Sequence, residues 1–329
     1  MLRVLVLGLA LVQPPAPHAP EPARLDALVR YVRARAESPD SLVLRAFESH
    51  HLVFVGDVHP AAGPKRLVAR LIPELARRGR LDVLALEVPF EQQPVIDLYL
   101  RSDPEDVGVL RAHPLTLRAH WGAAVEYLDV YRAVWLANRA GARIRIVAVD
   151  APRGPPQVAS EQEAVARYAR RDAVMASRIL REVLEPDPDV HVLIFLGGYH
   201  GLKQIGAEVE WNGARAPVRW MATRLEERWP EPVYTILTDG GPAPGRAGSP
   251  PGATRWFVLF QDRIEPEVRA PFAVAFDPVF DVWPRPLLDP EEGAISLRFR
   301  PREYGLAGSV DAYLYLGLDD PVTPLPASP

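Results

Sequence analysis

The chain has 329 residues, 48% of them hydrophobic and 24% charged, a composition typical of a globular protein with one large domain or two small ones. The formal net charge is -4 and no stretch is strongly basic, so no nucleic-acid partner is expected. Cysteine is absent, which excludes disulfides, thiolate metal sites, cysteine nucleophiles and a lipid anchor on cysteine.

The first 22 residues have the pattern of a signal or a disordered, proline-rich segment. Arg3 precedes an apolar stretch, residues 4–12, that is too short to span a bilayer as a helix. We therefore expect export to the periplasm or the extracellular space, with a cytoplasmic protein as the alternative. The prolines of residues 14–22 predict an extended or disordered stretch. Nothing later resembles a transmembrane helix, so no stable membrane span is expected.

Residues 23–239 alternate between helical and strand patterns. Apolar residues at helical spacing, or a capping box, predict helices near residues 22–36, 65–79, 91–100, 121–141 and 160–184. Apolar runs predict strands near residues 51–56, 81–87, 143–150, 190–200 and 232–239. The strands are apolar throughout and alternate with helices. This pattern predicts an α/β fold, with a mostly parallel central sheet and helices on both faces.

Residues 240–329 form an extension of different character. They begin with a proline- and glycine-rich stretch, residues 240–251, that predicts a loop or an insertion. The later segments 255–261 and 310–318 are strand-like, and we expect them to extend the sheet. The expected organisation is therefore a leading segment of residues 1–22, an α/β core of residues 23–239 and an extension of residues 240–329.

Polar residues stand where the apolar strands end. Asp57 and His59 follow the first strand, Glu87 ends the second, and His200 follows the fourth. Ligands of open α/β sheets bind at the carboxyl ends of the strands. We therefore expect these four side chains, from distant parts of the chain, to lie in one cleft.

The residue types of this cluster suit two kinds of chemistry. Asp57 and His59 are two residues apart, so both can point the same way and bind a metal. With Glu87 and His200 they would suit zinc, manganese or iron. Without a metal, Glu87 or a histidine would act as a general base on a small-molecule or peptide substrate. The structural alternative is that Asp57 caps the next helix and His59 is an ordinary loop residue.

Further polar residues are weaker candidates. Arg171 can reach an anion or a site carboxylate, or lie on a solvated helix face, and adjacent Asp172 is not expected to share its face. Asp150, which ends the third strand, is interpreted as either a cap or a ligand. Tyr127 is interpreted as a core residue. Two more histidines, His51 and His191, are expected to begin strands at the opposite sheet edge and are excluded.

Short motifs occur in the order and spacing of a known superfamily. They are GDVH after the first strand, ALE at the end of the second, RDAVMA on the long helix and GGYH after the fourth strand. Together they resemble the erythromycin esterase/ChaN/Tiki superfamily over roughly residues 43–238, and ChaN-like proteins most nearly. The positions that match its motifs are Asp57, His59, Glu87, Arg171 and His200. Asp57 departs from the pattern, because the superfamily usually has glutamate there.

The resemblance implies a central sheet flanked by helices and a site at its strand ends. It implies that His59, Glu87, Arg171 and His200 serve hydrolysis, which is metal-dependent in the Tiki proteases. It also implies an alternative, the binding of haem or another small ligand without catalysis, as in ChaN. A calcineurin-like metallophosphoesterase is a minor alternative. GDVH imitates the first motif of that family, but its G-D-x-x-D and G-N-H-E motifs are missing.

Overall fold

The computed structural model describes residues 22–113, 116, 118–119, 122–152, 160–203, 207–241, 271–275, 296–299, 308–318 and 322–324. The expected signal or proline-rich segment lies outside the described residues, apart from its last residue. The expected loop after residue 241 and the expected strand at residues 255–261 also lie outside them.

A helix lies at each of the five predicted positions. The helices are α1 (Pro22–Arg35), α2 (Pro39–Ser49), α3 (Gly63–Arg77), α4 (Gln93–Arg101), α5 (Val107–Ala112), α6 (Val125–Arg139), α7 (Glu161–Ile179) and α8 (Met221–Glu226). Of these, α2, α5 and α8 are additional helices that the sequence analysis does not predict. Short helical turns are η1 (Phe90–Gln92), the π-helical η3 (Leu180–Leu184) and η4 (Gly198–Gly201). Ser160 caps α7 as predicted, because its Oγ accepts a hydrogen bond from the amide of Glu163.

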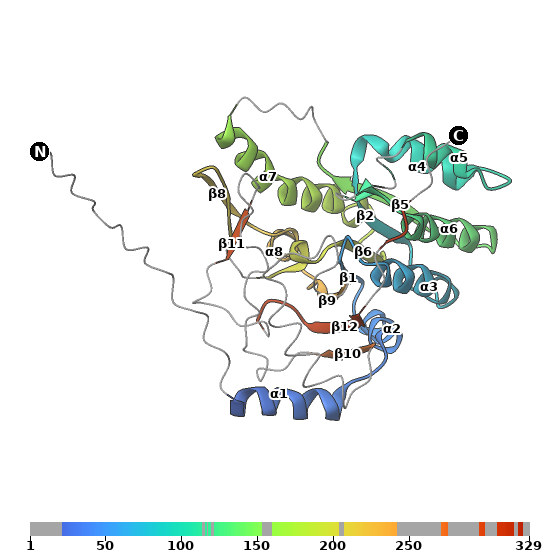
Figure 1. The fold of residues 1–329 in the computed structure, drawn as a ribbon. Coiled ribbons are helices and arrows are strands. Elements are labelled where there is room, and N and C mark those ends of the chain that lie inside the picture. The colour runs from blue at the N-terminus through green and yellow to red at the C-terminus, as the bar shows by residue number, and fades with distance from the viewer. Residues whose placement is uncertain are drawn as a thin grey trace, which may run out of the picture.

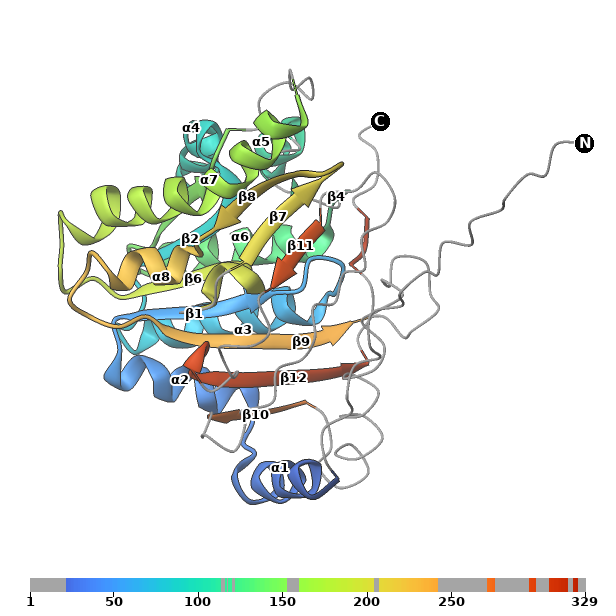
Figure 2. The same cartoon turned by 90° about the vertical axis from the view of Figure 1, so that its left-hand side faces the viewer.

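The main sheet confirms the predicted α/β fold. Its strands are β1 (Leu52–Asp57), β2 (Val83–Pro89), β5 (Arg145–Asp150), β6 (Val192–Gly197), β9 (Tyr234–Gly241), β10 (Phe272–Ala275) and β12 (Ala312–Leu318). Their order is β10-β12-β9-β1-β6-β2-β5, and the neighbours are parallel except β10 against β12. The strand predicted at residues 310–318 is β12 and extends the sheet as expected, and β10, for which there was no sequence prediction, lies beside it at the edge (Figures 1 and 2).

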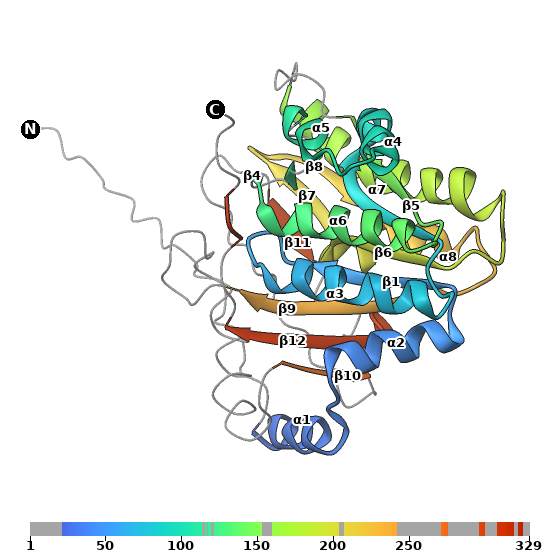
Figure 3. The same cartoon turned by 90° about the vertical axis from the view of Figure 1, so that its right-hand side faces the viewer.

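Alternate residues of each strand face opposite layers of helices. One face, with Val53 and Val55 of β1, packs against α2, α3, α4 and α6. The other face, with Leu52 and Phe54, packs against α7, η3 and α8. Figure 3 shows α3 and α6 covering the first face. Because both faces are covered, the strands are apolar along their length, and their polar residues collect at the ends.

Two local predictions needed correction. The helix expected from residue 121 begins at Val125, because Gly122–Ala123 forms β4 and pairs with β3 (Arg118–Ala119). The structure also contains a hairpin that was not predicted, β7 (Ala207–Trp211) and β8 (Ala214–Val218), with β11 (Ser296–Phe299) beside β7. Its turn is Asn212-Gly213, with φ of 46° and 85°, which is a strong hairpin signal in the sequence.

None of the helices in the described part of the chain combines the length and the apolar character needed to cross a membrane.

Candidate active site

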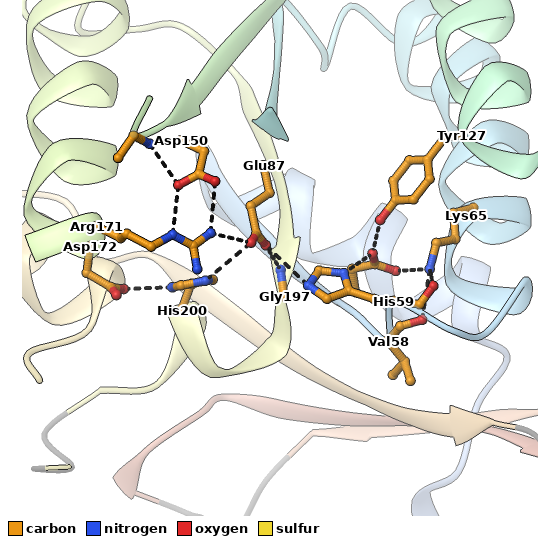
Figure 4. Close-up of polar contacts among 12 residues, drawn as sticks. Val58, His59, Lys65, Glu87, Tyr127, Asp150, Arg171, Asp172, Gly197 and His200 are labelled. Carbon is orange, nitrogen blue, oxygen red and sulfur yellow. Dashed lines mark hydrogen bonds and ion pairs between the residues drawn. The ribbon is translucent and has the colours of Figure 1, made fainter. Parts of the chain in front are cut away.

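The register of the sheet brings the predicted residues to one edge. Asp57, the last residue of β1, pairs with Gly197, the last residue of β6, and β2 carries Glu87 on the other side of β6. His59 follows β1 in the loop before α3, and His200 lies in η4 directly after β6. Figure 4 shows Glu87 between the two imidazoles.

Asp57 orients His59. The Nδ1 atom of His59 lies 2.8 Å from Oδ2 of Asp57, and the hydroxyl of Tyr127 donates to the same carboxylate oxygen. The other oxygen, Oδ1, lies 2.6 Å from Nζ of the buried Lys65. An ionised carboxylate accepts hydrogen bonds only, so Nδ1 of His59 carries a proton, and in the neutral imidazole the lone pair is on Nε2.

Buried charge keeps Asp57 ionised. Burial raises the pKa of this carboxyl, but the ammonium of Lys65 and the contact with His59 outweigh burial, and the net pKa is lowered. Burial and the neighbouring Asp57 raise the pKa of Tyr127 well above its ordinary value. The tyrosine therefore remains a hydrogen-bond donor, and the carboxylate remains its acceptor.

Glu87 links the two halves of the site. Its Oε2 accepts a hydrogen bond of 2.7 Å from the amide of Gly197 and lies 3.7 Å from Nε2 of His59. Its Oε1 accepts a 2.7 Å bond from Nη2 of Arg171 and lies 3.7 Å from Nε2 of His200. The carboxylate is thus fixed by two donors and faces one ring nitrogen of each histidine.

The second half of the site holds two cations, His200 and Arg171, each paired with carboxylates. Nδ1 of His200 lies 2.8 Å from Oδ1 of Asp172. Burial opposes the charged form of His200, but the carboxylates of Asp172 and Glu87 outweigh it and raise its pKa to about 10. Arg171 also donates two bonds, of 3.0 and 2.9 Å, to the carboxylate of Asp150. At neutral pH both His200 and Arg171 are therefore cations.

The close approach of β6 leaves little room for a side chain at position 197. A Cβ atom there would lie 3.1 Å from Nε2 of His59 and 3.2 Å from Oε2 of Glu87. The backbone of Gly197 thus forms one wall of the space in which the imidazole and the carboxylate face each other.

The structure brings together all five residues that the sequence singled out, Asp57, His59, Glu87, Arg171 and His200. It also corrects the interpretation of Asp172. Asp172 and Arg171 are adjacent on α7, yet both serve the site, because the arginine side chain is long enough to reach Glu87 from its own position.

Sequence reasoning missed two members of the site and left a third unranked. Tyr127 packs against the core, as the sequence predicts, but its hydroxyl also reaches Asp57, and no sequence prediction names Lys65. Lys65 stands three residues before Val68 and seven before Ile72, on the buried face of α3, and a lysine on such a face is a usable signal. Asp150, left as a cap or a ligand, accepts from both Arg171 and the amide of Ala151.

The donor set does not fit the divalent metal that the sequence suggested. Among the described residues, no group of three or more His, Asp or Glu side chains has an arrangement that could hold a metal ion. Cationic side chains already lie against both carboxylates, Lys65 against Asp57 and Arg171 against Glu87. Nδ1 of His59 and Nδ1 of His200 are directed at aspartates.

Comparison with known proteins defines the fold. No family model matches the chain, and no curated protein matches it in sequence. A variant of the erythromycin esterase EreC, in its open conformation, superposes with a TM-score of 0.54 at 13% identity, over 88% of this chain and 95% of the esterase. A succinoglycan biosynthesis protein gives a TM-score of 0.56 at 11% identity, over 91% and 98% of the two chains. A Bacillus cereus protein gives 0.54 at 10% identity, over 91% and 98%. The chain therefore shares its fold with EreC and these two proteins, as the resemblance of its motifs predicts.

Proposed function

We propose that the protein is a metal-independent hydrolase of acyl esters, with His59 as general base. The observation that carries the proposal is the position of two imidazoles on either side of Glu87, with Nε2 of each 3.7 Å from that carboxylate. One imidazole is oriented as a base by Asp57, and the other is held as a cation by Asp172.

His59 accepts the proton from water. Asp57 holds Nδ1–H, so Nε2 presents its lone pair, and the imidazolium that forms is stabilised by the adjacent carboxylate. The side chain of His59 is 15% exposed, more than those of Asp57 and Glu87 at 2% and 5%. It is therefore the member of this trio that water and substrate can reach.

His200 supplies a positive charge that stabilises the transition state. The water oxygen attacks the carbonyl carbon of the ester, and negative charge develops on the carbonyl oxygen, where a fixed cation stabilises it. The carbon–oxygen bond to the leaving alcohol breaks, and Nε2 of His200 gives its proton to the leaving oxygen. His59 is then protonated and His200 neutral. Glu87, which faces Nε2 of both, passes the proton back and restores the starting state.

The choice of esters rests on the fold comparison together with the site. The comparison protein EreC is an erythromycin esterase, but a shared fold alone does not define a reaction. Support from this chain's own residues is the base–cation pair, which suits acyl transfer to water. Small-molecule esters are therefore the substrate class proposed. Haem or small-ligand binding without catalysis stays the alternative prediction from sequence.

The test compares two histidines at opposite ends of β1. Hydrolysis of p-nitrophenyl acetate and butyrate is measured for the wild type, His59→Gln and His51→Gln. His51 precedes β1 at the far edge of the sheet, where its ring packs edge-on against that of His191, so it is a matched control. We expect kcat/KM to fall about 10²–10⁴-fold in His59→Gln and to stay unchanged in His51→Gln. Melting temperatures confirm that each variant is folded. Equal activity in wild type and His59→Gln would refute the proposal.

A further inference from the structure

The loop that carries His59 is held from inside the protein. Nζ of Lys65 donates to the backbone carbonyls of Val58, His59 and Ala61 at 2.8, 2.9 and 2.9 Å. Lys65 is 0% exposed, so these bonds form without competition from water. The ammonium of Lys65 thus fixes the backbone of this loop on the side that faces the protein interior. The carbonyl of Pro60, in the same loop, is held by a different segment.

A short segment far along the chain holds the carbonyl of Pro60. We call residues 322–324 the strap. The amide of Val322 donates a 2.9 Å hydrogen bond to the carbonyl of Pro60, the residue after His59. Pro324 forms a bridge with Ala124, immediately before α6. The strap therefore reaches from the loop of His59 to the start of α6.

The anchor of the strap is a buried carboxylate. Glu126, in the first turn of α6, is only 3% exposed. Its Oε1 and Oε2 accept bonds of 2.9 Å each from the hydroxyl and the amide of Thr323, and the amide of Val125 donates to the carbonyl of Thr323 at 2.9 Å. Arg66 lies 3.5 Å from Oε1. Each carboxylate oxygen thus has a specific donor, and such charge-assisted bonds are strong.

The strap contacts both of the segments that position the imidazole of His59. Glu126 is followed by Tyr127, whose hydroxyl donates to Asp57, which in turn orients His59. Pro60, at the other end of the strap, directly follows His59 in the chain. We infer that the strap positions His59 for the proposed hydrolysis, and that Thr323 and Glu126 are positioning residues. This inference rests on the proposed function, because misplacing a general base by about 1 Å lowers the rate.

The test removes one hydroxyl from the strap. Thr323→Val keeps the shape of the side chain but removes the hydroxyl that donates to Oε1 of Glu126, whereas Thr323→Ser retains the hydroxyl. Amide hydrogen exchange is followed at Ala61, which donates to Val58 within the His59 loop, and at Gly141 in a distant turn as a control. In Thr323→Val we expect exchange at Ala61 to rise about tenfold and kcat for p-nitrophenyl butyrate to fall about tenfold, with KM little changed. Thr323→Ser should restore both.

The two readouts separate failure of the strap from failure of the proposed function. Unchanged exchange at Ala61 in Thr323→Val would overturn the inference, whatever the activity. Faster exchange with unchanged kcat in an active enzyme would also overturn it, because the loop would then move without effect on the base. A wild type without esterase activity would overturn the proposed function and with it the positioning role, while faster exchange would still show that the strap holds the loop.

Discussion

Lys65 and Asp57 form an ion pair of 2.6 Å beneath the imidazole of His59, with the lysine fully buried. Two charges removed from water stabilise a protein only weakly as a pair, but loss of one partner leaves an uncompensated charge. The pair is therefore a sensitive point of the site, where stability and the orientation of the base depend on one contact.

Replacement of Lys65 by Met should lower the free energy of unfolding by about 3–5 kcal/mol, because Asp57 would remain buried without its counter-charge. Burial would then raise the pKa of Asp57, which Lys65 and His59 now keep low. Denaturant unfolding measures the loss. The double variant Lys65→Met/Asp57→Asn removes both charges and should recover part of the stability. A double variant no more stable than the single one would contradict this account.

The strand-end residues could be predicted because their position follows from a simple rule. Apolar strands of a parallel sheet end at one edge, so Asp57, Glu87 and His200 had to meet there if the strands were assigned correctly. The long α7 was also predictable, from its periodicity and its capping box at Ser160. These features depend on local sequence pattern alone.

Contacts between distant segments could not be predicted in this way. Thr323 binds Glu126 across 197 positions, and no local pattern links the two residues. The late start of α6 has this cause in part, because Ala124 pairs with the distant Pro324, whereas residues 122–123 pair locally with residues 118–119. The partner of each site carboxylate likewise depends on packing, so sequence suggested a metal where the structure places Lys65 and Arg171.

Replacement of Gly197 by Ala should impair catalysis more than folding. The added Cβ would lie 3.1 Å from Nε2 of His59 and 3.2 Å from Oε2 of Glu87, closer than most real Cβ contacts. We expect kcat to fall about 10- to 100-fold, because both groups must shift from their reactive geometry.

Gly198→Ala is the matched control for this variant. A Cβ at position 198 meets the flexible side chain of Leu237 at 3.3 Å and has no other contact within 4 Å. Steady-state kinetics and melting temperatures of both variants check the prediction. Equal losses of kcat in the two variants would show that the backbone of η4, and not the space at Gly197, limits catalysis.

The charge on His200 predicts a stability that falls with rising pH. Its pKa is raised from 6.5 to about 10 in the folded protein, through Asp172 and Glu87 acting against burial. Between these values the folded protein binds one proton more than the unfolded chain, so the free energy of unfolding decreases as pH rises. The contribution is fully present below pH 6.5 and is lost as pH passes about 10, with a slope of about 1.4 kcal/mol per pH unit between them.

Denaturant unfolding of the wild type and His200→Asn from pH 6 to pH 10 measures this slope. Other groups that titrate in this range contribute equally to both proteins, so the difference between the two curves isolates His200. NMR titration of the imidazole gives the pKa directly. A wild-type curve parallel to that of His200→Asn, or an imidazole that titrates near pH 6.5, would contradict the assigned charge.

Removal of metal should leave hydrolysis intact. The carboxylates of Asp57 and Glu87 are each held by a cationic side chain, so a divalent ion would have to displace Lys65 or Arg171 to bind. We expect the protein, purified without chelator, to contain less than stoichiometric zinc, manganese or iron. Its kcat/KM should not change after dialysis against EDTA. Loss of activity on dialysis, with recovery on addition of one of these ions, would restore the metal hypothesis drawn from the sequence.

An absorbance spectrum after incubation with haem tests the remaining alternative. Haem uptake that His59→Gln abolishes, in a protein without esterase activity, would favour a binding function.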